Sequence, residues 1–397
     1  MSSRRPLELV PRFTSQGYDD ESIAARRRWA EEKTGARLEC VAMHSMPGPS
    51  LRGNIENAIG AAQVPLGIAG PLVVRGEHAS GTFYVPFATS EGALVSSYER
   101  GMAALARAGG VEVRLERDEN RVSPAFACAD VGRAAELVRW FAGAREALAV
   151  VADATSRHGR LLRVSARQLG RHVIVDFDYS TGDASGMNMA VRATEHACRW
   201  AVEQSPADSF EIFSGGESEK RASAALWRGG KGKWATAGAT VPGSVLRSML
   251  RTDAAALARL SARTGAASLA AGTAANNGQL ANGLAAIFIA CGQDVANVAN
   301  AAVGITRFEE LADGAAYASV TLPSLTVGTV GGGTALATSR ECLSLLDCVG
   351  AGKAAKLAEI VAAALLAGEL SMAAAIASGE LGAAHEALGR NRPGTAD

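Results

Sequence analysis

The chain has 397 residues, of which 48% are hydrophobic, and its 40 Lys and Arg balance its 40 Asp and Glu. This hydrophobic fraction supports a sizeable core and excludes a largely disordered chain. Proteins that neutralise nucleic-acid phosphates normally carry a basic excess, so a net charge of zero argues against nucleic-acid binding. The six cysteines form no Cys-x-x-Cys pair, which favours a reduced, cytoplasmic protein.

The sequence does not predict membrane association. The N-terminus, MSSRRPLELVPRF, lacks the apolar segment of a secretory signal. The longest apolar stretches, 284–291 and 360–367, are about eight residues each, whereas a membrane-spanning helix needs roughly 20.

The first part of the chain predicts a charged helix, a turn-rich segment, a strand and a second helix. The first helix begins near Asp19, with acidic residues first and arginines later, as the helix dipole favours. Residues 60–72 contain too much Gly and Pro for a helix. A strand over 82–87 then leads through Glu91 to a helix over 93–108.

Between residues 111 and 212 the pattern indicates a small inserted α+β module. Its expected strands and helices cover 111–115, 131–151, 161–165, 172–177 and 186–203. From residue 213 the chain is rich in Ala and Gly and predicted to be mostly helical. Within that part, one strand and turn signal covers 317–333, and a long helix is predicted over 353–378.

Two glycine-containing segments have the composition of ligand-binding loops. Gly331, Gly332 and Gly333 follow a strand, and their N–H groups could face an anion, but on composition alone a tight turn is the favoured explanation. Residues 181–189 lead into a helix, as phosphate-binding loops do, but they do not fit the Gly-x-Gly-x-x-Gly pattern of a standard dinucleotide fold. Within them, Asp183 could be only a helix cap.

Several polar residues border apolar segments without a motif of their own. Asn282 and Asp294 flank a buried apolar run, and they would lie ~18 Å apart on one straight helix. A break in that helix is therefore needed if both are to serve one site. Glu91, Lys220 and His385, taken singly, are more typical of solvated surface residues.

Taken together, however, these segments closely resemble 3-hydroxy-3-methylglutaryl-CoA (HMG-CoA) reductases. No single segment is specific, but seven occur in the family's order and span residues 11 to about 392. The resemblance, without a membrane anchor, is to a soluble form of the sterol-pathway class. The matching segments are 56–72, 88–92, 155–157, 182–189, 291–294, 322–324 and 328–334.

The resemblance implies an α+β fold in three parts. A short helical N-terminal domain would cover 1–52, and a large, mostly helical domain for CoA and the acyl group would cover 53–110 and 213–397. A small ferredoxin-like insert at 111–212 would hold NADP(H). Active sites in the family form between subunits, so a homodimer or higher homo-oligomer is implied.

The implied reaction belongs to the mevalonate pathway of isoprenoid biosynthesis: a four-electron reduction of HMG-CoA to mevalonate that uses two NADPH and no metal. By resemblance, Lys220 supplies the cation beside the carbonyl oxygen and Glu91 donates protons. Asp294 tunes the pKa values of both. His385 would protonate the departing CoA thiolate.

The resemblance also assigns binding residues. Ser156 and Arg157 would hold the 2′-phosphate of NADPH, because arginine matches phosphate geometry. The rest of the dinucleotide site would consist of Asp183, Met187, Asn188, Gly331, Gly332 and Gly333. The substrate site would contain Glu56, Asn57, Ser214, Glu219, Arg221 and Asn282.

The chain departs from the family pattern where the free carboxylate of the acyl group is bound. Ala127 stands where an arginine is expected, and Arg121 and Arg263 are candidates to replace it. Ala384 stands where some members have a serine before the lid histidine. These departures leave two alternatives open: a reductase of a related acyl-CoA or carrier-protein thioester, and a non-catalytic CoA-binding subunit.

Overall fold

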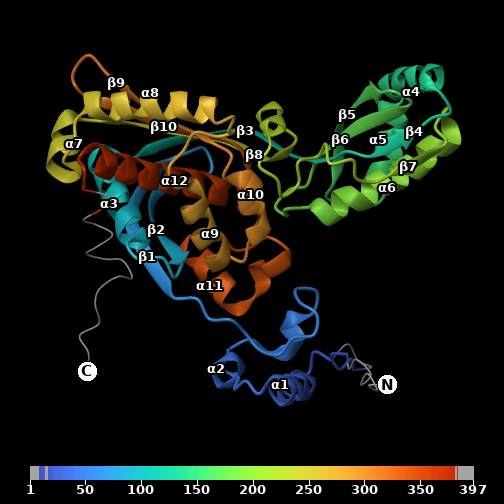
Figure 1. Cartoon of the computed structure of the whole chain (residues 1–397), viewed down its shortest axis with the longest axis horizontal. Coiled ribbons are helices and arrows are strands. Elements are labelled where there is room, and N and C mark those ends of the chain that lie inside the picture. Colours follow the sequence, from blue (N-terminus) through green and yellow to red (C-terminus); the bar gives the residue numbers. More distant parts are fainter. Residues whose placement is uncertain (1–8, 14–16, 381, 383–397) are drawn as a thin grey trace, which may run out of the picture.

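The computed structural model describes residues 9–13, 17–380 and 382 (Figure 1). Two helices and one short 3-10 helix near the N-terminus lie apart from the main body, around a small core formed by Ile23, Leu51 and Ala58. Asp19 caps the first helix by accepting a hydrogen bond from the Ser22 N–H at 2.8 Å. These elements are α1 (Asp20–Thr34), α2 (Glu39–Ala42) and η1 (Gly48–Leu51).

One ten-stranded sheet runs through the rest of the molecule, in the order β7-β4-β6-β3-β8-β10-β9. In addition, β1 pairs with β2 and β3, and β5 pairs with β6. Every pairing is antiparallel except the short one between β1 and β3. The strands are β1 (Leu66–Arg75), β2 (Ser80–Ala88), β3 (Val111–Val122), β4 (Ala125–Ala127), β5 (Arg160–Leu169), β6 (His172–Ser180), β7 (Ser209–Glu211), β8 (Lys231–Val241), β9 (Ile305–Glu310) and β10 (Ala316–Leu325).

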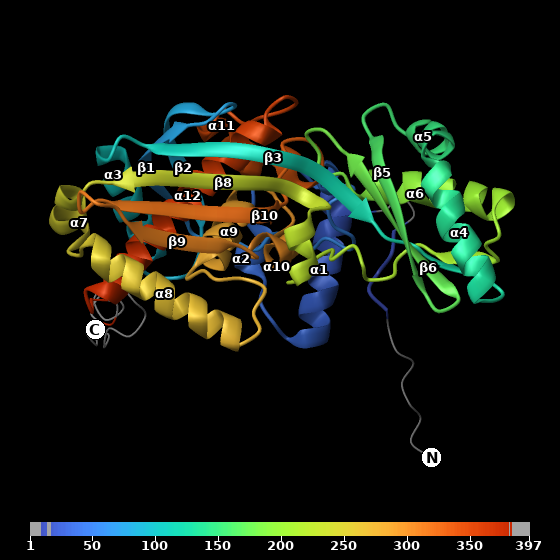
Figure 2. The ribbon, with the colours of Figure 1, turned by 90° about the horizontal axis from the view of Figure 1, so that it is seen from above.

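Strand β3 connects the main body to the small lobe. Residues 112–120 of β3 pair with β8 in the main body, and residues 120–122 pair with β6 in the lobe. Figure 2 shows β3 running from beside β8 towards β5 and β6. The lobe is therefore joined to the main body by continuous hydrogen-bonded strands.

The main body packs its helices around α12 (Ala354–Ala377), which lies against the sheet and is buried along most of its length. Glycines allow α12 to approach α3 closely, because a Cβ at Gly368 would meet the Tyr98 ring and one at Gly101 would meet the Ala367 backbone. The other helices of this body are α3 (Leu94–Arg107), η2 (Ala224–Arg228), α7 (Gly243–Leu250), α8 (Ala254–Ala270), α9 (Leu280–Ala290), η3 (Val295–Asn297), α10 (Val298–Ala301), η4 (Gly332–Ala335) and α11 (Ala337–Leu345).

Helix α12 is long and apolar enough to cross a membrane, which the short apolar stretches in the sequence did not indicate. However, 83% of its most apolar window is buried inside the protein. It is thus the central core helix of the main body.

The small lobe covers one face of its sheet with α4 (Val131–Gly143), α5 (Arg145–Asp153) and α6 (Met187–Gln204). The sequence predicted one helix over 131–151, but the structure breaks it at Ala144. Phe126, Phe141 and Phe177 lie in the core between helices and sheet. The opposite face of the sheet carries charged side chains.

The expectation of a mixed α and β fold is confirmed, but the large domain is not mostly helical. Strands β8 and β9 were missed: β8 lies inside the sheet between β3 and β10, and β9 lies at its edge beside β10. The three-part division at residues 52, 110 and 212 stays a prediction.

Candidate functional site

A cavity of about 770 Å³ opens where loops of the main body, the small lobe and the N-terminal segment meet. Polar side chains and bare glycine backbone make up part of its wall. Its lining includes Asn54, Ala184–Met189, Glu219, Lys220, Gly292–Val295 and Gly331–Thr334. It therefore brings together residues that lie up to 285 positions apart in the sequence, from Asn54 to Ser339.

Lys220 and Asp294 form an ion pair on this wall, with Nζ 2.8 Å from Oδ2. The hydrogen bond to Asp294 raises the pKa of Lys220; burial opposes this, and the charges of Asp294 and Glu219 raise it further. Lys220 is therefore a cation at neutral pH. Asp294 reaches it because α9 ends at Ala290 and the chain turns at Gly292, which has a φ of 64°. The required break in the helix is thus present.

Glu91 and Asn282 form a second pair at the other end of α9. The Asn282 amide donates to both carboxylate oxygens of Glu91, at 3.0 and 3.2 Å. Glu91 itself lies in the turn between β2 and α3, where its N–H donates to the Thr89 hydroxyl. Within residues 9–13, 17–380 and 382, no hydrogen bond or ion pair joins this pair to Lys220 and Asp294. His385 and Ala384 lie outside the described residues.

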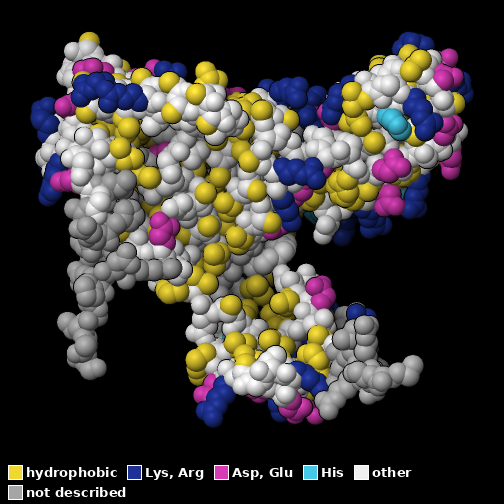
Figure 3. Space-filling view, in the orientation of Figure 1, with side chains coloured by type: hydrophobic (Ala, Val, Ile, Leu, Met, Phe, Trp, Pro, Cys, Tyr) yellow, Lys and Arg dark blue, Asp and Glu magenta, His cyan; other side chains and the backbone are white. Residues whose placement is uncertain are grey.

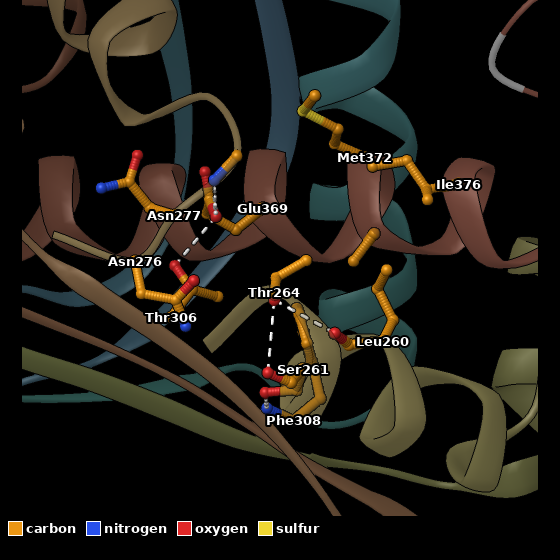
Figure 4. A pocket seen from close by; sticks show the side chains of 12 residues that line it. Leu260, Ser261, Thr264, Asn276, Asn277, Thr306, Phe308, Glu369, Met372 and Ile376 are labelled. Atoms are coloured by element: carbon orange, nitrogen blue, oxygen red, sulfur yellow. Dashed lines mark hydrogen bonds between the residues drawn. The ribbon is translucent and has the colours of Figure 1, made fainter. Parts of the chain in front are cut away.

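A buried carboxylate fixes the start of α9 and hence the position of Asn282. Glu369, on α12, accepts hydrogen bonds from the N–H groups of Gly278 and Gln279 at 2.8 and 2.6 Å, and from the Thr306 hydroxyl at 2.9 Å. Burial raises the pKa of Glu369, while these donors lower it. Figure 4 shows Glu369 beside Asn277 and Thr306, at a separate small pocket between α8 and α12.

A second buried charge fixes the loop that carries Lys220. The Lys231 side chain on β8 is 1% exposed and pairs with Glu219, the neighbour of Lys220. Its ammonium also lies 3.7 Å from the Met187 sulfur at the start of α6. Lys231 thus connects the Lys220 loop with the loop of the small lobe.

Asp183 does cap a helix, but that helix is α12 and not the α6 that follows it in sequence. Its carboxylate accepts hydrogen bonds from the N–H groups of Gly352 and Ala354 at 2.7 and 3.0 Å. Burial raises the pKa of Asp183, but the backbone donors outweigh this and hold it below its usual value. Its carbonyl also accepts from Thr329 and Val330, which fixes the glycine loop beside it.

The other predicted dinucleotide residues fall into two groups. Met187 and Asn188 line the cavity with Gly331, Gly332 and Gly333. Gly331 and Gly332 have φ values of 81° and 54°, and a Cβ there would enter open space, so their bare backbone faces a possible ligand.

Ser156 and Arg157 lie outside the lining of this cavity. The Ser156 hydroxyl donates to the Met189 sulfur at 2.8 Å and accepts from the N–H groups of His158 and Gly159. Arg157 is exposed in the turn between α5 and β5. Met189 thus links the Ser156 turn to the loop that lines the cavity.

The predicted substrate residues are also divided. Glu219 lines the cavity, whereas Ser214 and Arg221 lie at the two ends of its loop. Arg221 donates to the Gly215 carbonyl at 3.2 Å, and the Ser214 hydroxyl accepts from Gly216 at the same distance.

Glu56 and Asn57 are exposed and do not line the cavity. Asn54, two residues earlier, does. Sequence reasoning missed Asn54, Lys231 and Glu369; the last two leave a recognisable signal, since a charge within an apolar or glycine-rich segment needs a partner.

Neither candidate to replace the missing arginine lines the cavity. Arg121 binds Asp178 through Nε at 2.7 Å and Nη2 at 2.9 Å, so its guanidinium is already occupied by a carboxylate. Arg263 is exposed on α8, away from the cavity lining. Among the described residues, no group of three or more His, Cys, Asp or Glu could hold a metal ion.

Comparisons with known proteins agree on one family. Residues 22–390 match the family described as hydroxymethylglutaryl-coenzyme A reductase. Similar proteins are the 3-hydroxy-3-methylglutaryl-coenzyme A reductases of Methanothermobacter thermautotrophicus and Aeropyrum pernix. The first is 41% identical and covers 94% of each chain; the second is 42% identical and covers 94% of this chain and 91% of its own.

The fold is similar to a solved class II 3-hydroxy-3-methylglutaryl-CoA reductase from Streptococcus pneumoniae bound to NADPH. The TM-score is 0.68 at 20% identity, over 90% of this chain and 84% of that one. The family match over residues 22–390 and the identity to the two relatives show that the chain belongs to the hydroxymethylglutaryl-coenzyme A reductase family.

Proposed function

We propose that the chain reduces HMG-CoA to mevalonate and CoA with two NADPH. The observation that carries this proposal is the Lys220–Asp294 pair on the wall of a cavity whose other wall includes bare glycine backbone. The family match and the names of the similar proteins support the same reaction.

The reaction requires a cation where negative charge develops. Hydride addition to the thioester carbonyl places that charge on oxygen, and the Lys220 ammonium is charged and half-exposed to the cavity. The carbonyl carbon gains hydride and oxygen gains a proton, which gives a hemithioacetal. Its hydroxyl then releases that proton as the C–S bond breaks, which leaves an aldehyde, and the departing CoA thiolate takes up a proton. A second hydride and proton give the alcohol.

The proton donors are Glu91 for the reduction steps and His385 for the thiolate, as the family resemblance implies. Asn282 holds Glu91 by two hydrogen bonds and orients its carboxyl group. Asp294 raises the pKa of Lys220 and so favours its charged form.

The residues present fit a dinucleotide. Gly331 and Gly332 leave room for close approach, and Asn188 offers an amide at the cavity wall. NADPH, when bound, supplies the hydride for both reductions. The small lobe would hold it, with Ser156 and Arg157 at the 2′-phosphate. Arg157→Ala should then raise KM for NADPH far more than KM for NADH; an equal change would contradict this assignment.

A homo-oligomer accounts for two features of the isolated chain. Glu91 and Lys220 lie at opposite ends of α9, so a second copy would have to complete each site. Figure 3 shows hydrophobic side chains gathered over the middle of the main body. Exposed hydrophobic residues between positions 289 and 345 include Ile289, Val295, Val330 and Leu345.

We place the enzyme in the cytoplasm.

The proposal is tested by comparing Lys220→Met with Lys353→Met. Among the described residues, the Lys353 ammonium pairs with the exposed Asp347, and Lys353 does not line the cavity, so its substitution removes a lysine away from the proposed site. Lys220→Met should abolish HMG-CoA-dependent NADPH oxidation while CoA binding persists, and Lys353→Met should keep wild-type rates. Equal activity of both variants would refute the role of Lys220.

A further inference from the structure

Asn297 lines the main cavity, and its side-chain amide makes no hydrogen bond within the described part of the chain. The residue is 2% exposed, and its Oδ1 atom is buried without a partner. Burying an amide in this way is unfavourable, because its hydrogen bonds to water are lost and not replaced. A ligand that enters the cavity and pairs with this amide would account for it.

A neighbouring amide on the same wall is already used by the fold. The Gln293 Nε2 atom donates to the Cys291 carbonyl at 2.8 Å, and its Oε1 accepts from the N–H of Gly328 at 2.8 Å. Gly328 begins the segment that leads to the glycine loop of the cavity. Gln293 therefore ties the turn that carries Asn297 to the proposed dinucleotide-binding loop.

Asn300, one turn after Asn297, has a structural role instead. Its Nδ2 atom donates to the Ser324 carbonyl at 3.2 Å and to the hydroxyls of Ser324 and Thr326 at 2.9 Å each. Its Oδ1 is also unpaired, but the residue does not line the cavity. Asn300 thus joins α10 to the end of β10, a role for which Asn297 has no equivalent contact among the described residues.

The turn that carries Asn297 begins at the proposed reaction centre. Asp294 precedes η3, and its carbonyl accepts from the N–H of Asn297 at 3.0 Å. The carboxylate of the same Asp294 pairs with Lys220 at 2.8 Å. A ligand group held by Asn297 therefore lies near the carbonyl that Lys220 would polarise.

The chemistry of the unpaired amide selects one part of the proposed ligands. The hydride of NADPH leaves a ring carbon whose neighbour carries a primary carboxamide. This group presents a carbonyl acceptor and an N–H donor on one edge, so it can form two hydrogen bonds with an asparagine side chain.

Other amino and amide groups of the ligands fit less well. The adenine amino group lies at the end of the dinucleotide that we assign to Ser156 and Arg157, which do not line this cavity. The amides of the CoA arm are secondary and trans, so neither presents a donor and an acceptor on the same edge.

We propose that the Asn297 side chain binds the carboxamide of the nicotinamide ring, orients the ring beside the Lys220–Asp294 pair, and makes the enzyme selective for dinucleotides with a primary amide. This inference rests on the proposed function. Asn297 adds a specificity-determining residue to the glycine loop and the segment 184–189, which would contact the rest of the dinucleotide.

The test compares NADPH with its reduced 3-acetylpyridine analogue, in which a methyl group replaces the amino group of the carboxamide. Dissociation constants are measured by calorimetry with the full-length protein, so no turnover is needed. Wild type should bind NADPH about 10-fold more tightly than the analogue, and Asn297→Leu should bind the two within about twofold of each other. Because the ratio is compared between two proteins, intrinsic differences between the dinucleotides cancel.

Thermal unfolding separates this role from a structural one. Asn297→Leu replaces an unpaired buried amide by an apolar group of similar shape, so the ligand-free variant should melt at or above the wild-type temperature. Its stabilisation by NADPH should be smaller than that of wild type. Asn300→Leu is the matched control: it breaks three hydrogen bonds and should lower the melting temperature while keeping the preference for NADPH.

Two results would overturn the inference. One is equal affinity of wild type for NADPH and the acetyl analogue, which can be measured even if neither variant folds. The other is a loss of stability in ligand-free Asn297→Leu as large as in Asn300→Leu, which would show that an ordered water or another contact already satisfies the amide. A wild-type protein that prefers NADPH as expected but does not oxidise it with HMG-CoA would refute the proposed function instead.

Discussion

Substitution of Lys231 tests most directly how the Lys220 loop is held in place, because Lys231 pairs with Glu219 on that loop. Its ammonium is buried and pairs with Glu219, whose side chain is 18% exposed. Substitution Lys231→Met keeps the apolar stem but leaves Glu219 without its cation. Removing one partner of a buried ion pair costs about 3–5 kcal/mol, and we expect about 3 kcal/mol because Glu219 retains some contact with solvent.

The double variant Lys231→Met/Glu219→Gln removes both charges and should recover most of this loss, since no uncompensated charge remains. Lys353→Met is the surface control: its pair with Asp347 is exposed and should be worth less than about 1 kcal/mol. Chemical unfolding followed by tryptophan fluorescence gives the free energies, and NADPH oxidation gives the effect on Lys220. If Lys231→Met unfolds at the same denaturant concentration as wild type, or keeps wild-type kcat, the account of this loop is wrong.

Three further outcomes follow from single contacts. Asp294→Asn should lower the pKa of Lys220, so the basic limb of the kcat–pH profile should move to lower pH; an unmoved limb would contradict the pairing. The pKa of Asp183 in the folded protein lies below its usual value of about 4, so the ionised carboxylate stabilises the fold at pH values above about 4. This contribution is lost as the pH falls through the pKa of the folded state. Asp183→Asn should therefore flatten the loss of thermal stability in acid, and a profile parallel to wild type would refute the cap. Glu359, buried on α12, accepts hydrogen bonds from the N–H groups of residues 77–79 in the turn between β1 and β2. Glu359→Gln should therefore lower the free energy of unfolding by about 1–3 kcal/mol. An unchanged free energy of unfolding would show that this turn does not need the carboxylate.

Local sequence signals predicted the elements whose periodicity or composition is strong. The strand over 82–87 is present as β2, the helix over 93–108 as α3, and the helix over 353–378 as α12. Strand β8, with the sequence KGKWATAGATV, contains Gly, Ala and Lys that disfavour strands locally. It forms because β3 and β10 pair with it on both sides, which a single segment cannot reveal.

The site residues divide in the same way, into those that local composition indicates and those that only the fold brings together. The glycine loop and the segment 184–189 were found from composition, and both line the cavity. The pairing of Lys220 with Asp294 joins residues 74 positions apart and depends on the turn at Gly292, so spacing alone could not show it. Asp183 was recognised as a possible cap, but its actual helix begins some 170 residues later.

The central claim is tested most directly by the stoichiometry of the reaction in the purified protein. HMG-CoA and NADPH are mixed with it, NADPH consumption is followed by absorbance, and the acyl product is identified and quantified by mass. We expect two NADPH consumed for each mevalonate formed, with one CoA released. A protein that binds HMG-CoA but consumes no NADPH, or that reduces only another acyl thioester, would contradict the assignment.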